Sequence, residues 1–170
     1  MSDTRRRIHE HVESNPGVHF NALARELDLA AGQVQYHVRK LLGNDRIVEE
    51  PVYGRTHYYP PTYTPWERRA VALARRETCR ELLRYLLAAG SARPDEAAEA
   101  VGIARSTLQW HLDRLVEAEL VEKRHVRGGI VLEPVRPAET RRLLEEITPS
   151  VGDRLVDRFV SMVDDALDAN

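Results

Sequence analysis

The sequence predicts a mainly α-helical protein with small β-hairpins, in which one unit of two helices and a hairpin occurs twice. Apolar residues recur at helical spacing in short segments that meet at tight turns. Each helix pair is followed by two strand-like runs around a glycine-containing turn. A shift of 74 residues, which brings Gln35 onto Gln109, aligns the two units. These observations predict two small domains of one fold, followed by C-terminal amphipathic helices.

The first helix is expected to begin at a cap formed by Ser2 or Asp3 and to run to about Glu13. Ile8 and Val12 lie on one face of this helix and should point inward. The Asn-Pro-Gly sequence that follows is a helix stop signal.

Two further helical patterns meet at Asp28–Gly32, which is too short for anything but a tight helix-helix turn. Phe20 leads into the first of them and is expected to fill the core. The apolar stripes of the two helices are Ala22, Leu23 and Leu27, and Val34, Val38, Leu41 and Leu42. This arrangement predicts a helix-turn-helix, whose second helix is the candidate reader of a DNA groove.

The second helix carries a polar face opposite its apolar stripe. With Val34 at 0° and about 100° per residue, the polar face comprises Gln33, Gln35, Tyr36, Arg39 and Lys40. Amides pair with adenine edges, arginine pairs with guanine edges, and lysine suits phosphate. The face is therefore a candidate DNA-binding surface, and an ordinary solvated helix face is the alternative.

A β-hairpin follows, with strands at Arg46–Val52 and Thr56–Tyr59. We expect Arg55 at its tip, with His57 behind it, to contact phosphate or the minor groove. A solvated turn is the alternative.

The connector Tyr58–Trp66 is rich in proline and aromatic residues, so it should pack on the domains and fix their relative orientation. Thr64 and Glu67 form a capping box around Pro65. The helix that begins there is expected to run to Ala89. Because this is longer than one small domain needs, the helix should serve both domains or pair with a partner chain.

In the second copy, Q109-W110-H111-L112 aligns with Q35-Y36-H37-V38. The groove-facing set becomes Ser106, Thr107, Gln109, Trp110, Asp113 and Arg114. Asp113 takes the place of Arg39 and repels phosphate, although a carboxylate can accept from cytosine. An exposed tryptophan more often marks a protein interface. The first copy is therefore the better predicted reader, and the second reads DNA weakly or mediates dimerisation.

The second hairpin, Val121 to Val135, keeps cations around its Arg127 turn and favours some role in DNA binding. His37 and His111 occupy the same helix position beside the apolar stripe. Half-buried structural histidines are the main interpretation, and a pH or metal switch is the alternative.

The C-terminal region predicts a short charged helix from Pro137 to Ile147 and an amphipathic helix that begins at a Ser150 capping box. The apolar face of the last helix, from Val151 to Leu167, must be buried. It packs either on its own second domain or in a two-fold interface with another chain. We expect a homodimer formed through this helix.

The segment A-A-E-A-V-G-I-A-R-S-T-L-Q-W-H-L-D-R-L-V-E-A-E-L-V resembles the helix-turn-helix of winged-helix transcription regulators of the ArsR and MarR type. The segment N-P-G-V-H-F…Q-Y-H-V-R-K-L resembles the archaeal members of that group. The resemblance covers roughly residues 4–125. It implies an N-terminal winged-helix DNA-binding domain at 1–60, a second winged-helix domain at 61–135 and a helical dimerisation tail at 136–170. ArsR metal sensors carry a cysteine pair at the recognition region that this chain lacks, so metal sensing is not implied.

Composition narrows the functional classes. The net charge is −2, but acidic residues outnumber basic ones mainly in residues 133–170, by 9 to 5, away from the candidate reading helices. The single cysteine, Cys79, forbids an intrachain disulfide and suits a reducing cytosol. There is no apolar run of ~18 residues and no N-terminal signal-peptide pattern. We expect a cytoplasmic, nucleoid-associated protein.

No phosphate-binding glycine loop, metal-ligand spacing or nucleophile motif indicates catalysis, a metal or another cofactor. The sequence predicts a sequence-specific transcription regulator that binds double-stranded DNA and is not an enzyme. The alternative is a tandem winged-helix scaffold for protein-protein interactions in a chromosome or transcription complex.

Overall fold

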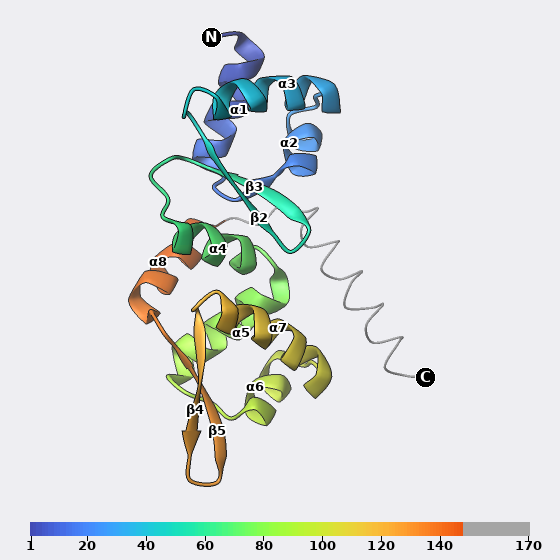
Figure 1. Ribbon diagram of the computed structural model, residues 1–170. Coiled ribbons are helices and arrows are strands. Elements are labelled where there is room, and N and C mark those ends of the chain that lie inside the picture. Colours follow the sequence, from blue (N-terminus) through green and yellow to red (C-terminus); the bar gives the residue numbers. More distant parts are fainter. Residues whose placement is uncertain (148–170) are drawn as a thin grey trace. The chain divides into compact units, whose positions relative to one another are not determined.

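The computed structural model describes residues 1–147 and divides into two compact units, Met1–Ala72 and Leu73 onward (Figure 1). The first unit contains α1 (Asp3–Ser14), β1 (Val18–His19), α2 (Phe20–Glu26), α3 (Ala31–Leu42), β2 (Val48–Val52) and β3 (Arg55–Tyr59). Helix α4 (Pro65–Ala74) spans the division, which falls after the boundary expected at residue 60. The mainly helical class with small hairpins is confirmed.

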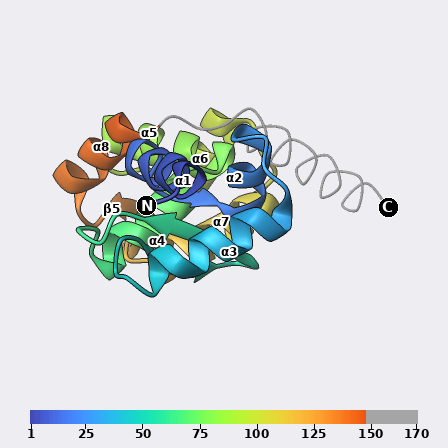
Figure 2. The ribbon, with the colours of Figure 1, turned by 90° about the horizontal axis from the view of Figure 1, so that it is seen from above.

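Helix α1 forms as its cap and periodicity predict. The Ser2 hydroxyl accepts from the Arg5 amide at 3.3 Å, which satisfies one of the free N–H groups of the first turn. Ile8 and Val12 have no exposed surface. They pack in one core with the apolar stripes of α2 and α3. Figure 2 shows α1 almost end-on, with α3 running past it.

The first unit contains a three-stranded sheet in the order β1-β3-β2, rather than the hairpin alone. In β1, Val18 pairs with Tyr58 and His19 with His57. The sequence did not predict β1, because a two-residue strand is too short for alternation to be recognised. Phe20, expected to fill the core, packs against it while only partly buried.

The connector packs on the first unit through specific bonds. The Tyr59 hydroxyl donates to the carbonyl of Arg68 at 2.6 Å, and Arg68 Nε donates to the Glu50 carboxylate at 3.0 Å. The predicted capping box is present, since the Thr64 amide donates to Glu67 Oε2 and the Glu67 amide donates to Thr64 Oγ1.

The prediction of one long helix from Pro65 to Ala89 is wrong, because the structure has two helices there, α4 and α5 (Glu77–Ala89). The chain becomes extended at Arg76 (φ −78°, ψ 128°), which is the N-cap residue of α5. The buried Arg80 side chain donates from Nη1 to the carbonyls of Ala74 (3.2 Å) and Arg75 (3.1 Å). This contact, made by a side chain only five or six residues further along, satisfies carbonyls at the end of α4, and helical periodicity does not show it.

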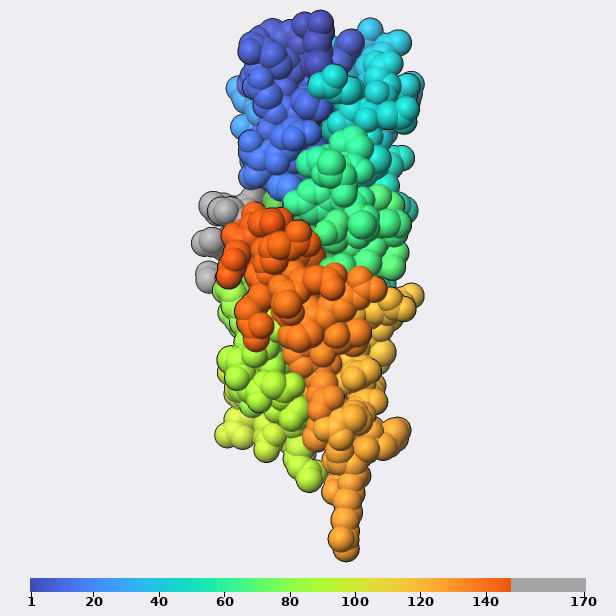
Figure 3. Space-filling model, turned by 90° about the vertical axis from the view of Figure 1, so that its left-hand side faces the viewer, coloured from blue at the N-terminus to red at the C-terminus, as the bar shows by residue number. Residues whose placement is uncertain are grey.

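The second unit continues with α6 (Pro94–Val101), α7 (Arg105–Glu117), β4 (Val121–Val126), β5 (Gly129–Pro134) and α8 (Pro137–Glu146). Strands β4 and β5 form an antiparallel hairpin, which projects from the unit as a narrow arm (Figure 3). Ala92 and Leu132 add one isolated bridge. Helices α6 and α7 repeat α2 and α3 at the predicted shift, so the predicted repeat is confirmed.

The predicted Ser150 capping box and the amphipathic helix after it lie outside the described residues. No helix in the part of the chain that the structure describes is long and apolar enough to cross a membrane.

Candidate nucleic-acid interface

Helix α3 is held in place by its buried edge and by a local cap. Val34, Val38 and Leu41 are at most 4% exposed and belong to the core of the first unit. Gln33 Oε1 accepts from the Ala30 amide at 3.2 Å, which ties the first turn of α3 to the preceding loop. Gln33 was predicted as a base contact, and it also has this structural role.

The opposite edge of α3 faces solvent. Gln35, Tyr36, Arg39 and Lys40 are all exposed, and Tyr36 keeps 55% of its surface accessible. Lys40 Nζ lies 5.9 Å from the centroid of the Tyr36 ring, close enough for a weak cation–π contact. Neither Arg39 nor Lys40 takes part in an ion pair within residues 1–147. The structure therefore brings four predicted residues together as an uncommitted polar face that includes two cations.

The first hairpin places Arg55 and His57 differently. Arg55 was expected at the tip, but it is the first residue of β3, where it pairs with Val52 and is partly exposed beside the turn. His57 is only 4% exposed, and its Nδ1 lies 2.7 Å from the carbonyl oxygen of Gly17. The prediction that His57 reaches DNA is therefore corrected. In a strand, successive side chains point to opposite faces, and this one points into the sheet's packed side.

The hairpin turn contains an exposed aromatic residue, Tyr53, which was not among the predicted site residues. Tyr53 has φ 46° and is 39% exposed, and Gly54 beside it has φ 82°. The register of the hairpin places it there, because Val52 pairs with Arg55 and leaves Tyr53 and Gly54 as the whole turn. Such turns require positive φ at both central residues.

The outer face of α7 differs from that of α3 because its polar groups already have partners. Gln109 Nε2 donates to Asp113 Oδ1 at 2.5 Å, and Lys123 Nζ lies 3.8 Å from the same oxygen. Arg114 donates from Nη1 to the carbonyl of Trp110 at 2.9 Å. Asp113 remains exposed and adds a negative charge to the centre of the face.

The other predicted residues of α7 divide between surface and core. Trp110 is 37% exposed and Ser106 is exposed. Thr107 is only 7% exposed, so its expected place on the groove-facing side is wrong. It lies beside Leu108 at the buried edge of the helix.

The second hairpin keeps a free cation at its tip. Arg127 is exposed and forms no ion pair among the described residues. Arg124, in contrast, lies 2.6 Å from Glu133 across the strands, and this contact lowers the pKa of Glu133. Arg93 Nη1 donates to the carbonyl of Gly128 at 3.3 Å and so supports the turn from the start of α6.

His111, a residue of α7, is partly buried beside Cys79. Burial lowers its pKa to about 4, and the charges of Arg76 and Arg114 act in the same direction. Its Nδ1 is 3.6 Å from the buried Cys79 Sγ. A partly buried, neutral imidazole agrees with a structural role. No group of three or more His, Cys, Asp or Glu side chains within residues 1–147 is arranged to hold a metal ion.

Comparisons with known proteins agree with this architecture. A family model described as an N-terminal HTH domain matches residues 2–71, and one described as a helix-turn-helix domain matches residues 73–124. An uncharacterised HTH-type transcriptional regulator from Methanocaldococcus jannaschii is 23% identical over 131 residues. That alignment covers 77% of this chain and 33% of the relative, so the chain spans about a third of the relative's length. The expected pair of tandem winged helix-turn-helix domains is confirmed.

Proposed function

We propose that this chain, with its two winged helix-turn-helix domains in tandem, is a transcription regulator that binds double-stranded DNA. One observation carries the proposal, namely the exposed outer face of α3, where Gln35, Tyr36, Arg39 and Lys40 lie opposite a fully packed apolar edge. The second helix of such a motif is the element that enters the major groove. The helix-turn-helix name of the archaeal relative supports the same function.

Each residue of this face has a distinct expected role. Arg39 and Gln35 carry the donors and acceptors that distinguish base edges in the major groove. Lys40 suits a phosphate, because its ammonium acts as a point charge. The partly exposed Arg55 on the hairpin is placed to contact the backbone beside the groove. Binding is therefore expected to be sequence-specific in α3 and anchored electrostatically around it.

The second domain contributes less to base reading in this proposal. Asp113 repels phosphate, and the groups around it are occupied by one another. Its hairpin tip, with the free Arg127, remains suited to a phosphate contact. Ser106, Gln109, Trp110 and Arg114 stay predicted as weaker contacts.

A homodimer formed through residues 148–170 is the proposed assembly. The segment alternates apolar positions such as Leu155, Phe159 and Val163 with acidic ones at helical spacing. Regulators with two-fold symmetry read two half-sites, so a dimer would explain a palindromic operator. A chain truncated after Ile147 should sediment as a monomer while the full chain sediments as a dimer. A protein that binds chromosomal DNA is expected in the cytoplasm at the nucleoid.

The deciding experiment is a fluorescence-anisotropy titration of a labelled, random-sequence 30-base-pair duplex at two salt concentrations. The wild-type chain should bind, with affinity that falls steeply as salt rises, because phosphate contacts release counterions. Arg39→Ala/Lys40→Ala should weaken binding on the order of tenfold or more. The control Arg84→Ala/Arg142→Ala removes the same charge from α5 and α8, and it should bind nearly as well as the wild type. Absence of salt-dependent binding by the wild type would reject the function.

A protein-interaction scaffold is the second candidate, and the face of α7 favours it. Trp110 and Arg114, residue types common in interface hot spots, lie together on a surface with no net excess of positive charge. In that case the titration above would show weak binding without salt dependence, and Trp110→Ala would abolish association with a protein partner.

A further inference from the structure

The second unit has a hollow of about 720 Å³ between α5 and α8, here called the α5–α8 hollow. Its apolar lining comes from Leu87, Ala88, Leu144 and Ile147. Its charged lining comes from Arg84, Arg141 and Glu145, with a net charge of +1. Arg141 Nη2 donates to the carbonyl of Leu87 at 3.2 Å, which holds the guanidinium beside the apolar lining. The hollow is therefore suited to an amphipathic, acidic occupant.

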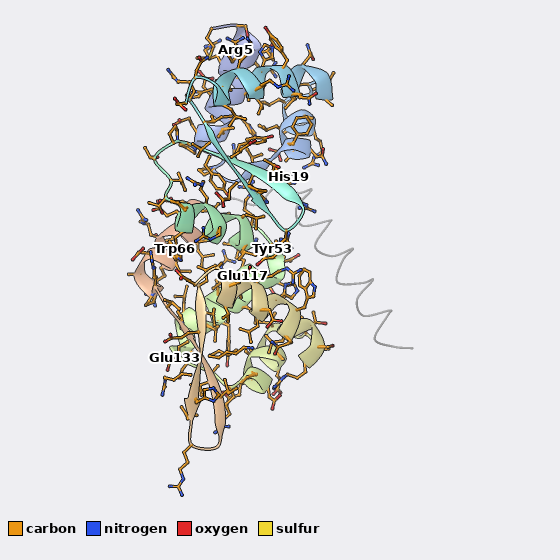
Figure 4. All side chains as sticks on the ribbon, viewed as in Figure 1. Arg5, His19, Tyr53, Trp66, Glu117 and Glu133 are labelled. Carbon is orange, nitrogen blue, oxygen red and sulfur yellow. The ribbon has the colours of Figure 1, made fainter. Side chains whose placement is uncertain are left out.

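The hollow lies away from the candidate reading helix of its domain. Helices α7 and α8 both pack against α5. In Figure 4, α8 is on the left of the second unit, and α7, which ends at the labelled Glu117, is on the right. Figure 2 shows the same separation of α8 and α7. An occupant of the hollow therefore leaves the outer face of α7 uncovered.

The segment of residues 148–170 begins at the edge of this hollow. Ile147 lines it, and Thr148, Pro149 and Ser150 precede the amphipathic helix that the sequence predicts. A loop of two to five residues is the usual link between two antiparallel helices. The predicted helix can thus fold back onto the hollow of its own chain without a long connection.

The charge of this segment is complementary to that of the hollow. Residues 148–170 contain five aspartates and two arginines, a net charge of −3, against the net charge of +1 around the hollow. The exposed Arg141 is the cation that a neighbouring aspartate would reach.

The apolar face of the predicted helix is too broad for a single contact. With Val151 at 0° and about 100° per residue, its apolar positions cover about 180°, whereas one buried stripe needs about 100°. The half that borders the aspartates contains Val156, Val160, Val163 and Leu167. The half that borders Arg158 contains Val151, Leu155, Phe159 and Met162. Only the first half presents acids to a cationic hollow.

We propose that residues 148–170 fold back on the second domain of their own chain and fill the α5–α8 hollow with the half that contains Val156. The half that contains Leu155 then faces the partner chain of the proposed dimer. The docked segment and the dimer are thus two separate contacts of one helix, and the docking does not depend on DNA binding.

The test is hydrogen–deuterium exchange of the full chain, measured by mass spectrometry below and above the concentration at which it dimerises. A helix of this length without packing is marginal in water, so slow exchange in residues 151–168 reports docking. The wild type should show slow exchange at both concentrations. Ala88→Glu puts an acid in the hollow and should speed this exchange about tenfold. Ala88→Lys is the matched control and should keep it slow, because Ala88 is exposed and both replacements are good helix formers.

Two adjacent tail variants separate docking from dimerisation. In the dilute chain, Val156→Glu should speed exchange, whereas Leu155→Glu should leave it slow and should abolish the dimer in sedimentation. Unchanged exchange in Ala88→Glu and Val156→Glu would overturn the inference. Wild-type protection that vanishes on dilution would overturn it too, because a second copy would then fill the hollow. A wild type that stays monomeric but exchanges slowly rejects only the proposed dimer.

Discussion

The guanidinium carbon of Arg114 lies 3.2 Å from the centroid of the Trp110 ring, one helical turn away on the same face of α7. At the corresponding place on α3, Lys40 Nζ stands 5.9 Å from the Tyr36 ring. In the second domain, Arg114 is thus stacked on Trp110 and bonded to its own helix. In the first domain, Lys40 remains available for contacts with a partner. One repeated motif has kept its shape in both copies and differs in the state of its outer face.

We expect Asp113, on the outer face of α7, to prevent the second domain from binding DNA strongly. Asp113→Arg introduces the residue found at the equivalent Arg39. It should tighten binding to a random duplex and steepen the slope of log affinity against log salt by about one to two. Glu145→Arg on α8 makes the same change in charge away from this face and is the control. Equal effects of the two variants would show that only net charge matters.

Arg39 and Arg55 are expected to affect binding in different ways. Arg39→Ala should cost about 1–3 kcal/mol on preferred sequences and relax the base preference at one position. Arg55→Ala should weaken binding to every sequence alike and reduce the salt slope by about one. Selection of bound fragments from a random duplex library, followed by sequencing, measures both. The division of roles is rejected if both variants lose affinity equally on all sequences.

Arg80 is expected to be a strong determinant of stability in the second unit. Its buried guanidinium donates to the carbonyls of Ala74 and Arg75, which otherwise lose their partner. Arg80→Met should lower the free energy of unfolding by about 2–4 kcal/mol, since removing a charged donor leaves buried acceptors unsatisfied. Urea unfolding followed by circular dichroism measures the loss. The exposed Arg84→Ala should change stability by less than about 0.5 kcal/mol.

His111 should make the second unit less stable in acid. Its pKa is about 4 in the folded chain and near 6.5 when unfolded. The unfolded chain therefore binds a proton first as pH falls through 6.5, and the imidazole's contribution to stability is lost between pH 6.5 and 4. The full shift corresponds to at most about 3 kcal/mol, reduced by solvent screening because the ring is only partly buried.

The matching experiment is urea unfolding of the wild type and His111→Gln at pH 7.5 and pH 5. Between pH 7.5 and pH 5, the free energy of unfolding should fall more for the wild type than for His111→Gln. Parallel losses would show that the ring is solvated or paired in the folded chain.

Short-range sequence patterns were sufficient to predict most of the helices. The Ser2 and Thr64 caps, the apolar stripes of α2 and α3 and the glycine-containing hairpin turns are short-range signals, and all of them appear in the structure. The polar face of α3 was predicted for the same reason, because a helix of known phase defines its own outer side. That its residues contact DNA stays a prediction.

Features that depend on distant contacts were missed. Strand β1 exists only because Val18 and His19 find a partner in β3. The end of α4 was missed for another reason, because a cap made by the Arg80 side chain five or six residues further along leaves no mark in helical periodicity. His57 looked like a tip residue until the sheet turned it inward.

The sequence by itself determined that this chain folds as two copies of one helix-turn-helix unit, since 3.6-residue and two-residue periodicities are properties of neighbouring residues. Only the tertiary structure decided which outer face is free, because Asp113 accepts a hydrogen bond from Gln109 on its own helix and pairs with the charge of Lys123 on β4. It also showed that Tyr53 is strained. Charge pairing and backbone strain are set by how elements meet in space, and spacing along the chain does not record that.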